Sequence, residues 1–568
     1  MKANSMIIAA AVSIFLSALI VASAAEIAYK NNAYEWIDSS WEGGAKPGAT
    51  DTALIPELPI LKTRYDAGTM QSNGLKQNEE IQTLRFSDLY GIKVQGNYTL
   101  TLNSVVCDDM SPSSEDTAQI ATNIVATSYL TLKGEASVFD IGENHVLNLA
   151  VNTLSASAGT SIEKTGVGTW LWSGSACEAA NSSLWVKEGS LIRTGNGYPS
   201  LKVNKLIVGG AGHEAVVEFG EATHVTKVPG SCDIDIRPGG MLKIDAAGSA
   251  YYEYLSVDHG TIDAPGYVFI MSNEKNTPDR DITYIFTGGT FIGDMQWPLN
   301  APFTIVGSDK PSVVVGKMNI LGNKFVVPDG SASVDFVIDG KIGGGNRQYG
   351  KQGPGTMLFI DRDPSDLYGI GRDFTVEEGT FILQSETEIG LGTNNIVVSA
   401  GATLGGTGHH VGGIDPDQAI RGLRGNITLN GASGNPATLA PGTVNYETGA
   451  FIPGTFTIGS AAQTNNVTFA GSCVLRIGVA KNEFSKLIVN GLFTMSGSDE
   501  LAIVGPEDPK KLPQGEHVIV STKEPLADVF TSVTYNGVAL VDSVGKVKYE
   551  SNAVIFRVST RGLTITVR

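Results

Sequence analysis

Residues 351–360 read K-Q-G-P-G-T-M-L-F-I, and residues 376–382 read V-E-E-G-T-F-I. An earlier stretch has the same two halves: residues 164–172 read K-T-G-V-G-T-W-L-W, and residues 186–192 read V-K-E-G-S-L-I. The lysine that opens the first half and the valine that opens the second are 22 residues apart in the earlier copy and 25 in the later one. A pattern of this length that occurs twice indicates an internal repeat.

Weaker copies of the second half occur at residues 257–262, 286–292 and 398–404. Each reads as a short strand, a polar turn that contains glycine, and another short strand, because glycine tolerates the positive φ of a tight corner. Residues 98–102 and 202–208 alternate in the way that is typical of a half-buried strand. After residue 25, no segment of 12 residues reads as an amphipathic helix. The chain is therefore predicted to be all-β.

Strand and turn units that repeat about every 20–25 residues favour a solenoid, because each unit can bury its apolar face only against its neighbours. A parallel β-helix is the form that such units predict. The two ends of the stack would expose strand edges, so both need caps. We predict an N-terminal capping segment over residues 26–60, β-helix repeats over residues 61–491 and a C-terminal β-rich cap over residues 492–568.

Residues 1–25 are predicted to be a signal peptide. Lys2 precedes an apolar run over residues 6–21, and residues 22–24 (A-S-A) have the A-x-A form of a signal-peptidase site. A retained membrane anchor is the alternative, but the apolar run is shorter than the ~20 residues that span a bilayer. No later stretch approaches that length, so we expect an exported protein with no integral membrane segment after cleavage.

The composition argues against a nucleic-acid partner. The 568 residues include 40 Lys and Arg against 58 Asp and Glu, a formal net charge of −18, whereas phosphate binding needs clustered cations. The four cysteines are far apart and lack the spacing of metal ligands: Cys107, Cys177, Cys232 and Cys473. Export permits disulfides in three pairings, among which the sequence does not choose, and small buried residues are the simpler interpretation. We predict no metal and no cofactor.

Four further motifs extend the repeat pattern. They are G-A-T-L-G-G-T-G at residues 401–408, A-T-L-A-P-G at 437–442, G-T-F-T-I at 454–458 and K-L-I-V-N-G at 486–491. With the two repeats, they resemble the autotransporter-associated β-strand repeat of large exported bacterial proteins. The resemblance implies a right-handed parallel β-helix that is displayed or released, often with an adhesive or surface role. Self-exporting members end in a translocator barrel, which residues 492–568 do not match, so self-transport is not implied.

β-Helices also host polysaccharide lyases and hydrolases, and glycoside hydrolysis uses two carboxylates that flank one groove. The acidic clusters considered for this role, or for Ca²⁺, are Asp108 with Asp109, Asp233 with Asp235, and Asp361 with Asp363 and Asp366. A solvated turn is the simpler interpretation of each cluster. Residues 276–279, 408–410 and 476–478 are similar to fragments of polygalacturonase motifs, but the Asp-Asp pair between the first two is missing and we interpret them as accidental. We assign no catalytic, cofactor-binding or metal-binding residue.

Trp170 and Trp172 lie on the same face of one predicted strand, because alternate residues of a strand point the same way. If they are exposed, they and Trp185 offer a surface for stacking on sugar rings, and if they are buried, they fill the core. Met357 and Phe359 occupy the matching places in the second repeat, which favours packing in the core.

The sequence predicts an exported, non-enzymatic β-helix repeat protein with a structural or adhesive role. It is expected to be secreted or at the cell surface, with the periplasm as an alternative, and its expected partner is a polysaccharide or another surface protein. The alternative functions are a polysaccharide-degrading lyase or hydrolase, a carbohydrate-binding β-helix protein, and a passive component of a split secretion system. The N-x-[ST] sequences carry little weight in a bacterial protein: they begin at Asn97, Asn181, Asn426 and Asn466.

Overall fold

The computed structural model describes residues 24–30, 35–56, 71–87, 92–109, 121–174, 176–179, 182–194, 200–201, 203–220, 232–245, 248–252, 254–271, 283–297, 303–320, 324–344, 349–362, 373–385, 395–410 and 425–558. Most regular structure in these residues is β-strand, with short 3-10 turns such as η1 (Asp38–Ser40), η2 (Glu42–Gly44) and η4 (Pro509–Lys511). Within these ranges no helix has the length and apolar character needed to cross a membrane.

The chain forms two compact units. Unit 1 consists of Met1–Leu206 with Ala215–Thr223, and unit 2 consists of Ile207–Glu214 with His224–Arg568. Strand β18 (Lys205–Val208) contains the boundary between them.

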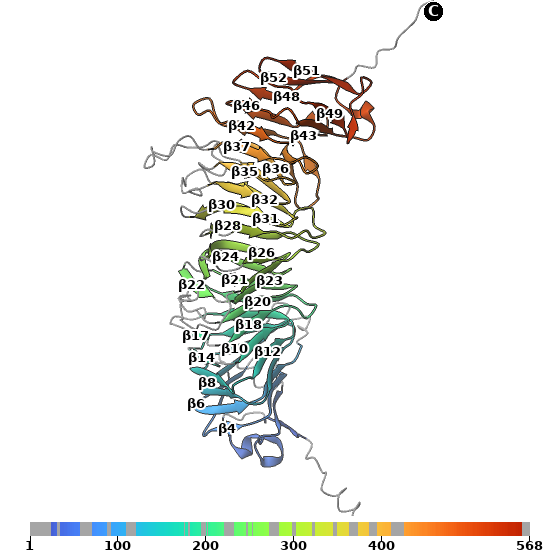
Figure 1. Cartoon of the computed structure of the whole chain (residues 1–568). Helices are drawn as coiled ribbons and strands as arrows, with labels where there is room; N and C mark the ends of the chain where they lie inside the picture. The colour runs from blue at the N-terminus through green and yellow to red at the C-terminus, as the bar shows by residue number, and fades with distance from the viewer. Residues whose placement is uncertain are drawn as a thin grey trace, which may run out of the picture. The chain divides into compact units, whose positions relative to one another are not determined.

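Unit 1 is a stack of parallel coils, in which each strand bonds to the corresponding strand of the next coil (Figure 1). The first face contains β1 (Glu26–Ala28), β2 (Thr52–Pro56), β5 (Thr83–Ser87), β7 (Ser104–Cys107), β9 (Ala136–Ile141), β12 (Ser161–Thr165) and β15 (Ser183–Val186). The second face contains β3 (Gln71–Gly74), β6 (Ile92–Leu102), β8 (Ala121–Leu132), β10 (His145–Leu149), β13 (Thr169–Trp172), β16 (Gly189–Arg193) and β19 (Ala215–Phe219). The third face contains β4 (Glu79–Glu80), the second halves of β6 and β8, β11 (Thr153–Ala156), β14 (Ala176–Glu178) and β17 (Ser200–Leu201).

Unit 2 repeats this arrangement over more coils. Its first face contains β20 (Asp233–Ile236), β23 (Tyr254–Asp258), β25 (Thr283–Thr287), β27 (Phe303–Ile305), β29 (Lys324–Val326), β31 (Tyr349–Gln352), β33 (Phe374–Val376), β35 (Ile396–Val398), β37 (Ile427–Asn430), β42 (Val467–Ala470) and β46 (Phe493–Thr494). Its second face contains β21 (Gly240–Ile244), β24 (Thr261–Met271), β26 (Thr290–Trp297), β28 (Ser312–Ile320), β30 (Phe336–Gly344), β32 (Thr356–Asp361), β34 (Thr380–Ser385), β36 (Thr403–His410), β38 (Ala437–Pro441), β43 (Cys473–Ala480), β47 (Glu500–Val504) and β49 (Ser532–Tyr535). The third face includes β22 (Gly248–Tyr252), β41 (Thr455–Ile458), β45 (Lys486–Val489) and β48 (Gly515–Thr522). These ladders confirm the predicted all-β parallel β-helix.

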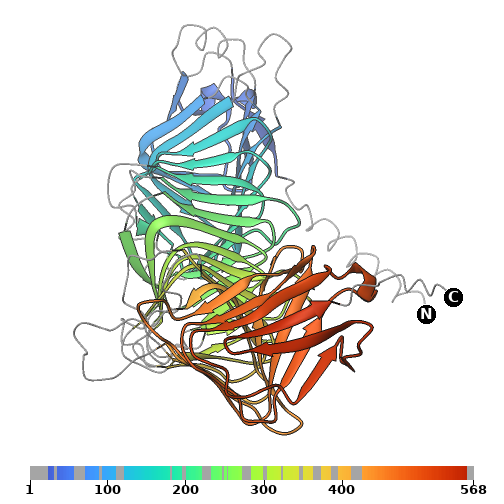
Figure 2. The same cartoon turned by 90° about the horizontal axis from the view of Figure 1, so that it is seen from above.

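The C-terminal strands of unit 2 change from parallel to antiparallel pairing. The parallel ladder continues beyond residue 491, since β45 pairs with β48 and β47 pairs with β49. β52 (Ala553–Val558) then pairs antiparallel with both β48 and β51 (Gly545–Glu550), and these strands lie side by side in red in Figure 2. β52 therefore covers an edge of β48 that would otherwise offer free backbone groups to another chain.

An aromatic cluster packs beside the first strand pair of unit 1. Tyr29, Trp36 and Trp41 are each at most 1% exposed. The ring centroids of Tyr29 and Trp41 are 5.1 Å apart, and those of Trp36 and Trp41 are 4.8 Å apart, both in edge-to-face geometry. These residues lie in the predicted N-terminal capping segment, where they form a buried aromatic cluster.

Side chains at equivalent positions stack in columns inside each unit. One column of unit 1 consists of Leu147, Trp170, Leu191 and Val217, all buried. Trp172 is also buried, and its ring centroid lies 5.8 Å from that of Trp170. Both tryptophans therefore fill the core, and they do not offer a sugar-stacking surface. A longer column in unit 2 consists of Phe336, Met357, Phe381, Leu404, Leu439, Leu475 and Leu501.

The register explains why the two halves of the repeat motif occur together. Lys164 of β12 lies beside Val186 of β15, and Lys351 of β31 lies beside Val376 of β33. The two halves of each copy therefore occupy adjacent coils. Both lysines are fully buried, and desolvation lowers the pKa of each to about 8.

Backbone carbonyl oxygens at the corners of the coils accept hydrogen bonds from these buried ammonium groups. Lys351 Nζ donates to the carbonyl oxygens of Gly353 and Glu378, the latter at 2.8 Å. Gly379 follows with a φ of +67°, and a Cβ at this position would collide with Lys351 Nζ. Lys164 Nζ likewise donates to the carbonyl oxygen two residues further along the chain. The lysine of the first half of the motif and the glycine of the second half, Lys351 and Gly379 in the later copy, are thus in contact with each other.

Asparagine side chains form a ladder at another corner of unit 2. Asn395 Oδ1 accepts hydrogen bonds from the backbone N–H groups of Gly425 and Asn426, both at 3.1 Å. Asn426 Oδ1 accepts from the N–H of Asn466 at 2.8 Å, and Asn466 Oδ1 accepts from that of Leu492 at 2.9 Å. Two of the four N-x-[ST] sequences therefore begin with an asparagine that joins successive coils.

The contact between Lys351 and Gly379 predicts a specific cost for an added methyl group. We expect Gly379→Ala to destabilise the protein more than Gly434→Ala, which has a similar φ of +78° but open space around its Cβ. The control carries the backbone strain alone, and the difference of about 1–3 kcal/mol measures the overpacking against Lys351 Nζ and the backbone carbonyl oxygens of Gly353 and Gly355. Urea unfolding of both full-length variants checks this, and equal losses of stability would contradict the contact.

Candidate functional site: an apolar groove beside Phe451

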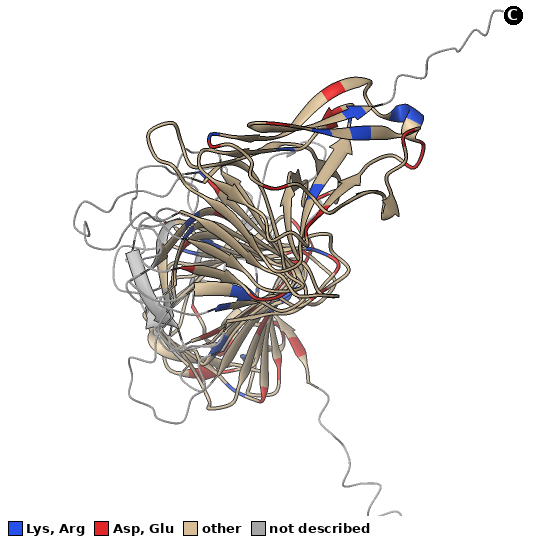
Figure 3. Ribbon diagram, turned by 45° about the horizontal axis from the view of Figure 1, so that its top comes forward, with Lys and Arg blue, Asp and Glu red and all other residues tan. Residues whose placement is uncertain are grey.

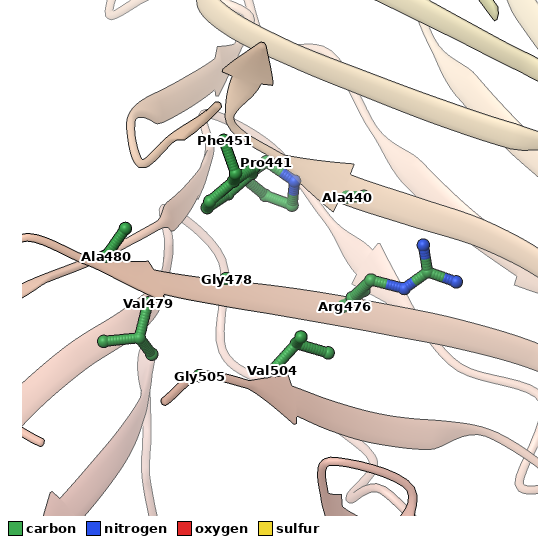
Figure 4. Close-up of a pocket in the computed structure, with 9 residues that line it drawn as sticks. All are labelled: Ala440, Pro441, Phe451, Arg476, Gly478, Val479, Ala480, Val504 and Gly505. Atoms are coloured by element: carbon green, nitrogen blue, oxygen red, sulfur yellow. The ribbon is translucent and has the colours of Figure 1, made fainter. Parts of the chain in front are cut away.

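An apolar groove of about 420 Å³ opens on the outward side of the second face of unit 2 (Figure 4). This volume lies within the range of small-molecule sites. The groove is formed by β38, β43, the end of β47 and the hairpin strand β40 (Phe451–Ile452). Its lining contains one titratable side chain, and the nine residues are Ala440, Pro441, Phe451, Arg476, Gly478, Val479, Ala480, Val504 and Gly505.

A hairpin places the aromatic ring of the groove. β39 (Thr443–Val444) pairs antiparallel with β40, and Val444 lies opposite Phe451. Asn445 fixes the connecting turn, because its Oδ1 accepts hydrogen bonds from the N–H groups of Glu447 at 3.0 Å and Thr448 at 2.8 Å. This is the local bonding for which asparagine is favoured in turns.

Two glycines make room for the Phe451 ring on the sheet. A Cβ at Gly442 would lie 2.6 Å from the ring, and a Cβ at Gly478 would lie closer still. The ring therefore packs directly against two backbone segments, and its position is set by them. Phe451 nevertheless remains 37% exposed, and Val504 on the neighbouring strand is 44% exposed. The groove thus has a fixed aromatic surface that faces solvent.

Arg476 is the one charged residue of the groove. It points outward from β43, between buried Leu475 and Ile477, and its neighbour on the next coil is the small residue Ala502. In the described ranges, its guanidinium makes no hydrogen bond or ion pair. Charged residues of both signs are interspersed along the ribbons in Figure 3. The side chain extends along the sheet in Figure 4, away from Phe451.

The three fragments similar to polygalacturonase motifs lie in different kinds of places in the structure. Residues 276–279 lie outside the described residues. His410 is fully buried, so residues 408–410 belong partly to the core. Arg476 and Gly478 both line the groove, although residues 476–478 read as an accidental match in the sequence. The signal that could have found them is an isolated arginine at an outward position of an otherwise apolar strand.

Two of the acidic clusters bond to neighbouring groups of the scaffold. Arg85 donates to Asp108 at 3.0 Å, and Asp109 accepts from the backbone N–H of Glu143 at 2.9 Å. In the second cluster, the side chain of Asp235 pairs with Arg237 at 3.0 Å.

The third acidic cluster is described only in part. Asp361 ends β32 and is 5% exposed, whereas Asp363 and Asp366 lie outside the described residues. Among the residues that the structure describes, no group of three or more His, Cys, Asp or Glu side chains has the arrangement of a metal site.

Three cysteines of the described residues are buried and are not in a disulfide: Cys107, Cys232 and Cys473. Burial raises the pKa values of the Cys107 and Cys473 thiols, so neither is a thiolate at neutral pH. They behave as the small buried residues that the sequence predicted. The side chain of Cys177 lies outside the described part of the structure.

A histidine bridges two carboxylates elsewhere on unit 2. His259 occupies a turn with a φ of +49°, its Nδ1 lies 2.6 Å from Asp258 Oδ1, and its Nε2 lies 2.9 Å from Asp309 Oδ1. Hydrogen bonds to these carboxylates raise the pKa of His259. The protonated ring can donate to both of them at once, and it thereby ties two turns of the unit together.

This bridge predicts a pH-dependent stability. Because the folded state raises the pKa of His259, its contribution is fully present below the unfolded value of ~6.5 and is lost as pH rises through the folded value. We expect His259→Asn, which tolerates the left-handed turn, to abolish this decline in the free energy of unfolding. Urea midpoints from about pH 5.5 to about pH 8.5 measure it. Parallel curves for the variant and the parent would refute the bridge.

No protein-family model matches the chain, and no curated protein matches it. The resemblance to autotransporter-associated repeats therefore rests on the motifs in the sequence and stays a prediction.

Proposed function

We propose that this chain is an exported, non-enzymatic β-helix protein with a structural or adhesive role at the cell surface. The predicted signal peptide supports export, and the repeat motifs support display or release outside the cell. The proposed partner is an extracellular or cell-surface polysaccharide or another surface protein.

The groove beside Phe451 is the observation that carries the proposal. Among the described residues that line it, Arg476 is the only titratable one, and an arginine does not serve as a general base. Hydrolysis of a glycosidic bond uses a carboxylic acid and a second carboxylate on either side of the bond. An aromatic surface beside one positively charged side chain suits binding a ligand rather than cleaving it.

The use of polar residues elsewhere supports the same interpretation. Lys164, Lys351 and Asn426 bond to the backbone at coil corners, and Asp108 is paired with Arg85. Side chains that form these bonds stabilise the β-helix. A polysaccharide lyase or hydrolase is the alternative function, and its clearest candidate residue is Asp361.

Incubation with polysaccharides distinguishes the two functions. We expect the purified exported chain to release neither new reducing ends nor unsaturated products from neutral and acidic polysaccharides, with or without Ca²⁺. We also expect it to be retained on cells of its own source. Products that persist through repurification and vanish in the Asp361→Asn variant would overturn the proposal in favour of an enzyme.

A further inference from the structure

We propose that the groove beside Phe451 binds a sugar residue that carries a carboxylate, with the ring on Phe451 and the carboxylate on Arg476. This inference rests on the proposed function and specifies its ligand. The carboxylate-bearing sugar is a uronate-type residue. It belongs to a longer chain, because the groove is open to solvent along the sheet.

Phe451 supplies the stacking surface. Its ring is fixed against Gly442 and Gly478, so little conformational freedom remains to be lost when a ligand binds. The C–H faces of a pyranose ring are apolar and pack on aromatic rings. Pro441 and the exposed side chain of Val504 extend the apolar surface beside it.

Arg476 supplies the anion-binding group. Its guanidinium presents a planar fork of donors that matches a carboxylate in bidentate geometry. Within the described residues no side chain pairs with it, and the small neighbours Ala440 and Ala502 leave it uncovered. A neutral sugar or an apolar peptide in the groove would cover this cation without pairing it, which is costly.

The two groups lie over the same side of one strand. Arg476 and Gly478 point to the same side of β43, so their Cα atoms lie about 7 Å apart. Phe451 lies over Gly478, and the guanidinium extends away from it along the sheet. The carboxylate of a pyranose ring on Phe451 would lie along the strand on the Arg476 side, and the exposed Arg476 side chain would turn back toward Phe451 to pair with it.

The negative net charge of the chain does not prevent the contact between Arg476 and a carboxylate. The formal net charge of −18 is spread over 568 residues, and at physiological ionic strength charges are screened beyond about 8 Å. The bidentate contact is made at hydrogen-bond distance, so it is only weakly screened. The net charge instead slows the approach of a polyanion, and added salt is expected to speed association.

Binding of oligogalacturonate and of its carboxyl-reduced counterpart tests the inference on the full exported chain by titration calorimetry. We expect Arg476→Gln to weaken binding of the acidic oligomer about tenfold or more and to leave the reduced oligomer unaffected. Phe451→Ala is expected to weaken both. Arg557→Gln is the matched control, since Arg557 is an exposed arginine of another strand, and urea midpoints verify that each variant is folded.

The outcomes separate the inference from the function on which it rests. Equal affinity for the two oligomers, no binding of either, or no effect of Arg476→Gln would overturn the carboxylate site, while retention on cells would still support the adhesive role. Tighter, Arg476-dependent binding of a sulfated oligomer would overturn the assignment to a carboxylate. Release of cleavage products would overturn the proposed non-enzymatic function itself.

Discussion

Backbone hydrogen bonds between successive coils hold every other feature of this protein in place. In unit 2 the strands of the second face pair residue by residue, so Met357, Phe381 and Leu404 lie directly beside one another. A slip of one residue would move each buried column to the opposite face of its strands, because alternate side chains of a strand point to opposite faces. The continuous apolar columns therefore fix the register, and the register in turn places the groove.

The corners of the coils create a second requirement. Backbone groups there lack strand partners, and buried groups of this kind must be satisfied. Lys351 supplies donors to corner carbonyl groups, whereas Asp335 accepts from the N–H groups of Gly330 at 2.6 Å and Thr356 at 2.8 Å. Burial raises the pKa of Asp335 despite these bonds. The polar side chains inside the coils thus form hydrogen bonds with backbone groups at the corners that have no partner in a neighbouring strand.

The sequence predicted the fold because its signals are local and repeated. The recurrence of K-x-G-x-G-T and V-x-E-G reflects the contact of a buried lysine with a glycine of the next coil, which every copy must preserve. The groove has no such repetition. Phe451 and Arg476 come from different strands, and they line one groove only because a hairpin brings the ring over Gly442 and Gly478. Residues 476–478 read as an accidental fragment because the Asp-Asp pair of the motif series is missing, and their environment depends on strand pairing that a single strand does not reveal.

The direction of the hydrogen bonds has a mechanical consequence. In each unit they run from coil to coil, perpendicular to the strands, so tension along a stack acts on every interface between coils, and the coil with the weakest interface opens first. Opening that coil releases a length of chain comparable to the 22 residues between Lys164 and Val186, each extending by about 3.3 Å. The coils beneath keep their own neighbours and their own columns. A chain anchored at one end and loaded at the other would lengthen in steps and absorb work, instead of detaching in a single event.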